Sequence, residues 1–118
     1  ETLVAVIRGA LPAPVQRKMG GHPARRVFQA LRIAVNEELC ALQEGLQAIP
    51  SLAAPGALLF VVSYHSLEDR IVKTVFRLWK EQGRGEILSK RLIRPSSDEV
   101  ESNRKSRSAK LWVFRFNP

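Results

Sequence analysis

The chain has 118 residues, and its 19 lysines and arginines against 11 aspartates and glutamates give a formal net charge of +8. This length can bury one modest core, so we expect one domain or a piece of one. The charge favours a polyanionic partner, most simply nucleic acid, although a solubilising surface charge is the alternative. The single cysteine, Cys40, excludes an internal disulfide and a zinc cluster, and we expect an inert core thiol and no metal site. No apolar run is long enough for a membrane span and the start has no signal-peptide character, which predicts a soluble, cytoplasmic chain.

Helical spacing of apolar residues dominates the first part of the chain. It predicts a helix over residues 2–10, stopped by Pro12 and Pro14. A basic, glycine-containing linker should span residues 15–22. One long helix is then predicted from Pro23 to Ala48, since proline is favourable in a first turn. Its apolar stripe consists of Phe28, Leu31, Val35, Leu39, Leu42, Leu46 and Ile49.

The centre of the sequence predicts a strand followed at once by a capped helix. Ala57–Val62 is apolar at every position, which is typical of a strand covered on both faces in a parallel sheet. Ser66, followed three residues later by Asp69, resembles a capping box and predicts a helix to about Gln82. His65 stands at the carboxyl end of the strand, where α/β proteins bind ligands. An ordinary cap explains Ser66 and Asp69 equally well, but it leaves His65 unexplained.

Two further strands are predicted in the last third of the chain. They lie near Ile87–Ile93 and at Lys110–Phe116, after a flexible turn at Gly83–Gly85. The polar segment Pro95–Ser108 between them has at most a short helix after Ser96-Ser97. The whole pattern predicts an α/β fold.

Three polar arrays are candidates for function. The first is a stripe on the long helix that borders its apolar face, where either ligand contacts or ordinary salt bridges are expected: Arg25, Gln29, Arg32 and Asn36. The second is a basic stripe on the next helix, either a solvated face or a phosphate contact: Arg70, Lys73, Arg77 and Lys80. The third is the run Asn103–Lys110, which contains Arg104 and Arg107. It suits either a phosphate-contacting loop or a disordered linker.

Several segments occur in an order that carries a family resemblance. They are residues 22–36 (HPARRVFQALRIAVN), Pro55-Gly56, residues 63–73 (SYHSLEDRIVK) and residues 107–111 (RSAKL). They closely resemble the C-terminal part of the RsmH (MraW) family, the ribosomal RNA small subunit methyltransferases H. Members of that family use S-adenosylmethionine to methylate the N4 atom of a cytidine in 16S ribosomal RNA. Two departures are Ala57, where the family usually has a second glycine, and the aromatic-rich ending Trp112–Phe116.

The resemblance implies a fold and a set of roles. Residues 1–21 would end an inserted helical substrate-binding domain, and residues 22–118 would be the last part of a Rossmann-like methyltransferase sheet with a final antiparallel strand. His65, Ser63 and Asp69 would orient the cytidine amine at the catalytic centre. Substrate-binding roles fall to Arg25, Gln29, Arg32, Asn36, Arg70, Arg104 and Arg107. The partner would be the small ribosomal subunit.

The family's acidic, glycine-rich turn for the cofactor is missing from this sequence. Gly20-Gly21 follows a basic linker rather than a strand, so it fails the context expected of a nucleotide-binding turn. The chain therefore resembles a fragment that is inactive alone, and a non-catalytic RNA-binding module or degenerate paralogue is the alternative. An exposed half-sheet, with open edges at Leu58–Val62 and Leu111–Phe116, predicts a homodimer or a strand-exchanged assembly.

Overall fold

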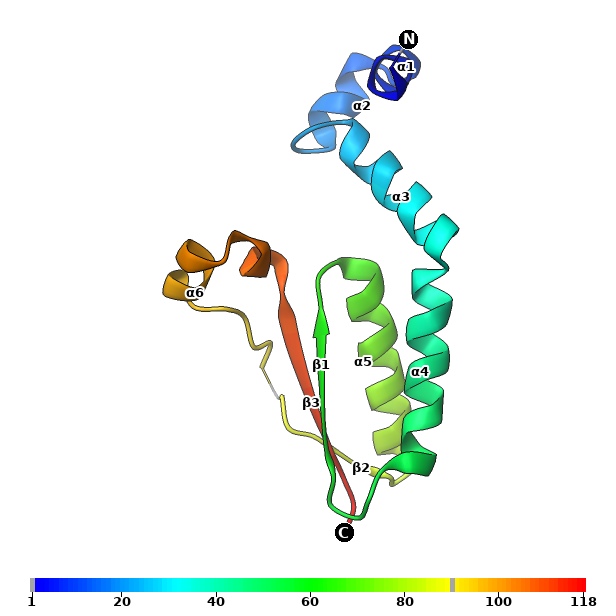
Figure 1. The fold of residues 1–118 in the computed structure, drawn as a ribbon, viewed down its shortest axis with the longest axis vertical. Helices are drawn as coiled ribbons and strands as arrows, with labels where there is room; N and C mark the ends of the chain where they lie inside the picture. The colour runs from blue at the N-terminus through cyan, green and yellow to red at the C-terminus, as the bar shows by residue number, and fades with distance from the viewer. Residues whose placement is uncertain (1, 90) are drawn as a thin grey trace. The chain divides into compact units, whose positions relative to one another are not determined.

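The computed structural model describes residues 2–89 and 91–118 of the chain (Figure 1). It divides into two units, Glu1–Glu38 and Leu39–Pro118, which are described separately below. Across the described residues, no helix combines the length and the apolar character needed to cross a bilayer.

The first unit is helical. Helix α1 (Leu3–Ala10) confirms the first predicted helix, and the Thr2 hydroxyl caps it by accepting a hydrogen bond from the Ala5 N–H. Helix α2 (Ala13–Lys18) occupies part of the predicted linker, so that prediction is wrong there. Pro14 stands in the first turn of α2, where its missing N–H costs no hydrogen bond, and it starts a helix instead of only ending one.

The predicted long helix is interrupted at Glu37. Helix α3 (Ala24–Asn36) ends there because Glu37 adopts a left-handed conformation with φ of 51°, and helix α4 (Glu38–Leu52) follows. One continuous helix over Pro23–Ala48 was therefore the wrong prediction. Of its apolar stripe, Leu46 is buried in the core, whereas Val35 is 80% exposed. The expectation of a core thiol is also wrong, because Cys40 is exposed.

The second unit combines helices with a small antiparallel sheet, which confirms the predicted α/β class. Its further elements are β1 (Leu58–Ser63), α5 (Ser66–Glu81), β2 (Gly85–Ile87), α6 (Ser97–Ser102), the 3-10 helix η1 (Arg104–Ser108) and β3 (Lys110–Phe116). In the described part of the chain the strand order is β1-β3-β2, and β3 is antiparallel to both neighbours. The final strand has the predicted bounds.

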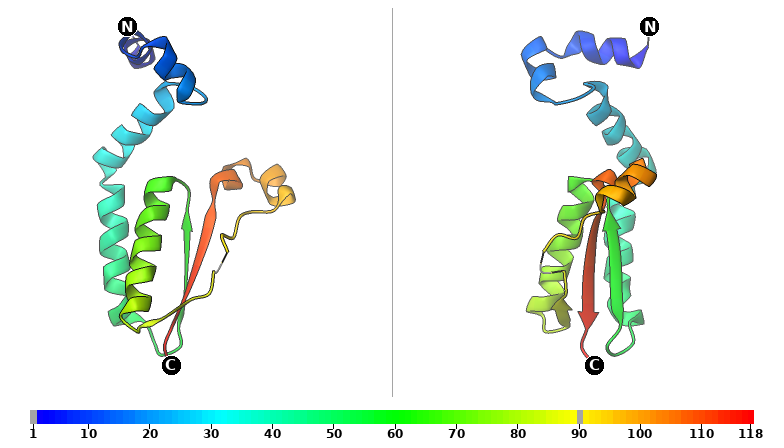
Figure 2. Two further views of the ribbon diagram at one scale, coloured as in Figure 1. Left: turned by 180° about the vertical axis from the view of Figure 1, so that it is seen from behind. Right: turned by 90° about the vertical axis from the view of Figure 1, so that its left-hand side faces the viewer.

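Helix α5 lies against one face of this sheet (Figure 2), and an aromatic cluster fills the space between them. Phe76 of α5 and Phe114 of β3 are both fully buried, and their ring centroids lie 5.3 Å apart. Trp79 packs edge-on against Phe114 and also contacts Phe116. The aromatic ending that departs from the family pattern is thus core: each large ring buries apolar surface that a small core needs.

Strand β1 is covered on one face only. Leu58, Phe60 and Val62 are 51%, 60% and 50% exposed, and they alternate with residues that pack under α5. The prediction of a strand covered on both faces is therefore wrong for this chain. Strand β3 lies in the centre, so its edges are paired, and the expectation of an open edge at Leu111–Phe116 is also wrong. Only β1, among the described strands, keeps a long unpaired edge.

The segment between α5 and β3 differs from its prediction in detail. Strand β2 begins at Gly85 and ends at Ile87. The predicted strand near Ile87–Ile93 includes residue 90, which lies outside the described residues; among the others, Ile87 belongs to β2 and Ile93 forms an isolated bridge with Leu111. The expected short helix is confirmed as α6, which Ser96 caps. The run predicted as a phosphate-contacting loop or a disordered linker is an ordered turn of 3-10 helix, η1, so the linker alternative is wrong.

Candidate functional site

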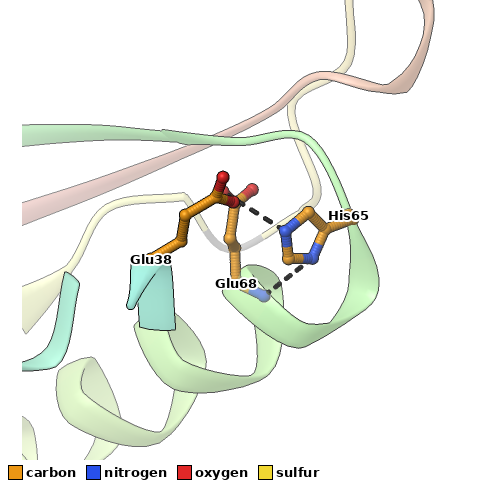
Figure 3. A group of neighbouring side chains, drawn as sticks. All are labelled: Glu38, His65 and Glu68. Atoms are coloured by element: carbon orange, nitrogen blue, oxygen red, sulfur yellow. Dashed lines mark hydrogen bonds and ion pairs between the residues drawn. The ribbon is translucent and has the colours of Figure 1, made fainter. Parts of the chain in front are cut away.

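The start of α5 is built around His65, at the carboxyl end of β1. The His65 Nδ1 atom accepts a hydrogen bond from the Glu68 N–H at 3.3 Å (Figure 3). The Glu68 carboxylate accepts one from the Tyr64 N–H at 2.8 Å. His65, rather than Ser66, is therefore the helix cap, one residue earlier than predicted. Histidine is not among the usual capping residues, which is why the sequence pattern misplaced the cap. The histidine that the capping interpretation left unexplained now has a structural role.

The tautomer of His65 follows from this cap. Because Nδ1 accepts a hydrogen bond, the proton of the neutral ring is on Nε2. That Nε2 atom lies 3.4 Å from a Glu68 carboxylate oxygen but makes no hydrogen bond to any described residue. The side chain is only 11% exposed and the Nε2 atom is itself buried, so the ring is held in one orientation with Nε2 facing the Glu68 carboxylate.

Asp69 ties the first turn of α5 to the central strand. It accepts hydrogen bonds from the Trp112 indole N–H at 2.8 Å and from the Ser63 hydroxyl at 3.4 Å. The Lys110 ammonium lies 3.3 Å from its other carboxylate oxygen. Burial alone would raise the pKa of Asp69, but the hydrogen bonds from Trp112, Lys110 and Ser63 and the Lys110 charge outweigh it and lower that pKa. Asp69 is thus held ionised as the link between helix and strand.

A cavity of about 260 Å³ lies where β1, α5 and the end of η1 meet. It joins two segments that are distant in sequence, residues 64–66 and 107–110, and adds one residue from the loop before α6. The lining residues are Tyr64, His65, Ser66, Arg94, Arg107, Ser108, Ala109 and Lys110. Both polar motifs that carry the family resemblance in the second unit therefore contribute to one site.

The cavity has the chemistry of an anion-binding site. Three cationic side chains line it: Arg94, Arg107 and Lys110. The Lys110 ammonium also forms an ion pair with Asp69. Ser66 and Ser108 add hydroxyl groups that donate or accept hydrogen bonds. The cavity also opens at the N-terminus of α5, where free backbone N–H groups and the helix dipole favour negative charge. Phosphate or ribose groups of a nucleic acid fit this combination.

The remaining predicted residues fall elsewhere. Arg32 binds the Glu38 carboxylate through two hydrogen bonds of 2.9 and 3.2 Å, and Asn36 donates to the same carboxylate at 3.3 Å. For these two residues of α3 the geometry supports the helix-edge salt-bridge alternative. Arg25 is exposed and Gln29 half-buried on the same helix, and Arg70 and Arg104 are exposed on α5 and η1. A substrate-binding role for each of them stays a prediction.

Among the charged lining residues, the sequence did not indicate Arg94, and it included Lys110 only as the last residue of the run Asn103–Lys110. Arg94 gave no signal because it only follows a predicted strand and precedes Pro95. Lys110 belongs to the segment that carries the family resemblance, but its pairing with Asp69 depends on contacts across the sheet. Its position in the RSAKL segment could have indicated it.

Comparison with known proteins matches residues 1–117 to the MraW methylase family. The "Ribosomal RNA small subunit methyltransferase H" of Coprothermobacter proteolyticus is 55% identical over 80% of this chain and 31% of its own length. The proteins of the same name from Rhodopirellula baltica and Leptospira biflexa are 52% and 47% identical, over 96% and 98% of this chain and 33% and 37% of their own lengths. The chain thus spans about a third of the length of these relatives. With nearly its whole length matched, the chain belongs to the MraW methylase family.

Proposed function

We propose that this chain is the C-terminal part of an enzyme that methylates the N4 atom of a cytidine in small-subunit ribosomal RNA. Membership of the family and the names of the relatives support methyl transfer to that RNA. The observation that carries the proposal is the cationic cavity, because it gathers both polar motifs of the second unit at the carboxyl end of β1. In this assignment residues 1–21 end an inserted helical domain that binds substrate, and residues 22–118 belong to the methyltransferase domain.

The methyl donor of such an enzyme would be S-adenosylmethionine, which supplies the methyl group of the reaction. The described residues do not fit its glycine-rich turn. Gly20 and Gly21 have positive φ but follow helix α2, and the strand-to-helix connection Ser63–His65 contains no glycine. We therefore expect the isolated chain to be inactive.

The reaction sets a positioning task for the cavity. The lone pair of a cytidine N4 atom is delocalised into its ring, so the amine has to be held in line with the methyl donor. The base also has to leave its stack to reach an enclosed site. The His65 Nε2 atom is buried beside the Glu68 carboxylate, so His65 would act by forming part of the cavity wall and by capping α5. The hydroxyl groups of Ser66 and Ser108 would then contact the substrate. Ser63 is 1% exposed and acts through Asp69 as a positioning residue.

The test compares cells that lack the complete reading frame with cells in which it is restored. Mass spectrometry of the small-subunit RNA should find N4-methylated cytidine only after restoration. The alternative, a non-catalytic RNA-binding module or degenerate paralogue, predicts identical RNA in both cells while the purified protein still binds it. Methylation at another atom would keep the enzyme class but overturn the cytidine N4 assignment.

A further inference from the structure

A second basic groove, separate from the cavity at His65, runs along the side of α5. It has a volume of about 530 Å³ and lies between α5 and the segment that starts with β2. Its lining residues are Asp69, Lys73, Arg77, Lys80, Ile87, Ser89, Leu92 and Trp112. None of them lines the first cavity. Asp69 is the one lining residue that also takes part in the proposed catalytic positioning.

The cations of the groove form one line on the helix. Lys73, Arg77 and Lys80 follow one another at i, i+4 and i+7, which places them on a single face of α5. With a rise of about 1.5 Å per residue, they span about 10 Å along the helix axis. All three side chains are exposed. This line is therefore long enough to follow consecutive phosphates of a nucleic-acid strand.

These charges are available to a ligand. Within the described residues, none of the three cations makes a side-chain hydrogen bond or ion pair. The one acidic residue in the groove lining, Asp69, is already engaged by Trp112 and Lys110. A row of unpaired cations on a concave surface attracts a polyanion more strongly than scattered surface charges do.

The opposite side of the groove is less charged. Ile87 and Leu92 provide apolar surface, and the half-buried Trp112 indole and the Ser89 hydroxyl complete the lining. A groove with a row of cations on one side and aromatic or apolar surface on the other is typical of single-strand nucleic-acid binding. The phosphates contact the cations, and the bases or riboses lie on the apolar side. An acidic peptide would use the cations but would gain less from the aromatic surface.

We propose that this groove binds the sugar–phosphate backbone of single-stranded RNA next to the site of methylation, with Lys73, Arg77 and Lys80 as the phosphate contacts. The identity of that RNA as ribosomal rests on the function proposed above, whereas the binding itself does not. Arg70, which the sequence placed in the same stripe, is absent from the groove lining and is not part of the proposed site.

The test uses the complete protein and a fluorescent oligouridylate, with affinity measured as a function of salt. The double variant Lys73→Gln with Arg77→Gln should bind about tenfold more weakly at low salt, and the slope of log K against log salt should become shallower by about 1.4, because two phosphate contacts are lost. The matched control removes two exposed cations outside the groove, Arg26→Gln with Arg84→Gln, and should keep both the affinity and the slope. The exchange Lys73→Arg with Arg77→Lys conserves the charge and should also keep both.

Equal losses in the groove variant and the control would overturn the proposal, since they would reflect net charge alone. Tighter binding of polyglutamate than of RNA, with the same dependence on Lys73 and Arg77, would overturn it in favour of an acidic peptide. If the double variant fails to fold, Lys80→Gln alone should reduce the slope by about 0.7, and an unchanged slope would refute the site. If the groove variants lose RNA binding but the wild-type protein shows no detectable methylation, the groove proposal stands and the proposed function is refuted.

Discussion

At the scale of single residues, Asp69 joins helix α5 to two strands of the sheet. Its carboxylate accepts hydrogen bonds from Trp112 and Ser63 and forms an ion pair with Lys110. Ser63 belongs to β1, whereas the other two residues belong to β3. It was predicted both as a member of a helix cap and as a catalytic residue. The geometry gives it a structural role that neither prediction contained, because two of these partners lie more than forty positions along the chain.

Asp69→Ala should lower the free energy of unfolding by about 1–3 kcal/mol, since it leaves the Trp112 indole N–H and the Lys110 ammonium without their acceptor.

The lowered pKa of Asp69 also fixes the direction in which pH changes the stability of the protein. A carboxyl whose folded pKa is depressed contributes stability above its unfolded pKa, and the contribution is lost as pH falls below about 4, through the folded value. Denaturant unfolding between pH 7 and pH 2 should show this acid loss in the wild type and less of it in Asp69→Asn. Glu101→Gln, an exposed site on α6, serves as the control, and equal acid profiles for all three proteins would contradict the account.

At the scale of elements, local patterns predicted most helices and strands but not their interruptions. A run of apolar residues predicted β1, and the final strand was predicted with the bounds that β3 has, Lys110–Phe116. The break at Glu37 could not be predicted, since glutamate favours helices and nothing in its neighbours requires a left-handed backbone. The exposure of one face of β1 could not be predicted either. Apolar residues show that a strand face is suited to burial, but they do not show whether another element covers that face.

The candidate site shows the same division between local and distant information. His65 was found from its position after a strand, and Arg107 from its basic run. The cavity that joins them, and the contribution of Arg94, depend on the pairing of β1 with β3. That pairing is a contact between residues far apart in the chain, which spacing along the sequence does not reveal.

Gly85 gives an element-scale prediction at the start of β2. A Cβ atom there would collide with the backbone carbonyl of Arg115 and with the Phe114 ring. Gly85→Ala should therefore destabilise the protein by about 1–3 kcal/mol or more, as overpacking does. Gly45→Ala is the matched control, because that glycine lies within α4 with open space around it, and it should stabilise by about 0.5–1 kcal/mol. Thermal unfolding of both variants measures the difference, and similar melting temperatures would contradict the close approach.

At the scale of the whole molecule, the free edge of β1 bears on assembly. The edge lies beside an uncovered apolar face formed by Leu58, Phe60 and Val62. Exposed edges and apolar faces favour pairing with another strand. In a longer protein other strands would take this place, and in the 118-residue chain a second copy is the available partner.

The isolated chain should therefore form a dimer or a strand-exchanged assembly in sedimentation experiments. Phe60→Lys should weaken this association, because it places a charge on the uncovered face. Leu78→Lys, which changes an exposed residue of α5, should leave it intact. A monomer at high concentration for the wild-type chain would refute the prediction.

The central claim, that the cavity at His65 serves methyl transfer to ribosomal RNA, is tested most directly by separating the cap from the ring chemistry. Asparagine caps helices well, so His65→Asn in the complete protein should keep the thermal stability of the wild type, whereas His65→Ala should lose about 0.5–2 kcal/mol. Methyl transfer to small-subunit RNA should fall at least tenfold in both variants, since neither retains the imidazole ring that lines the cavity. Wild-type methylation by His65→Asn would show that His65 acts only as a helix cap and would contradict the assignment.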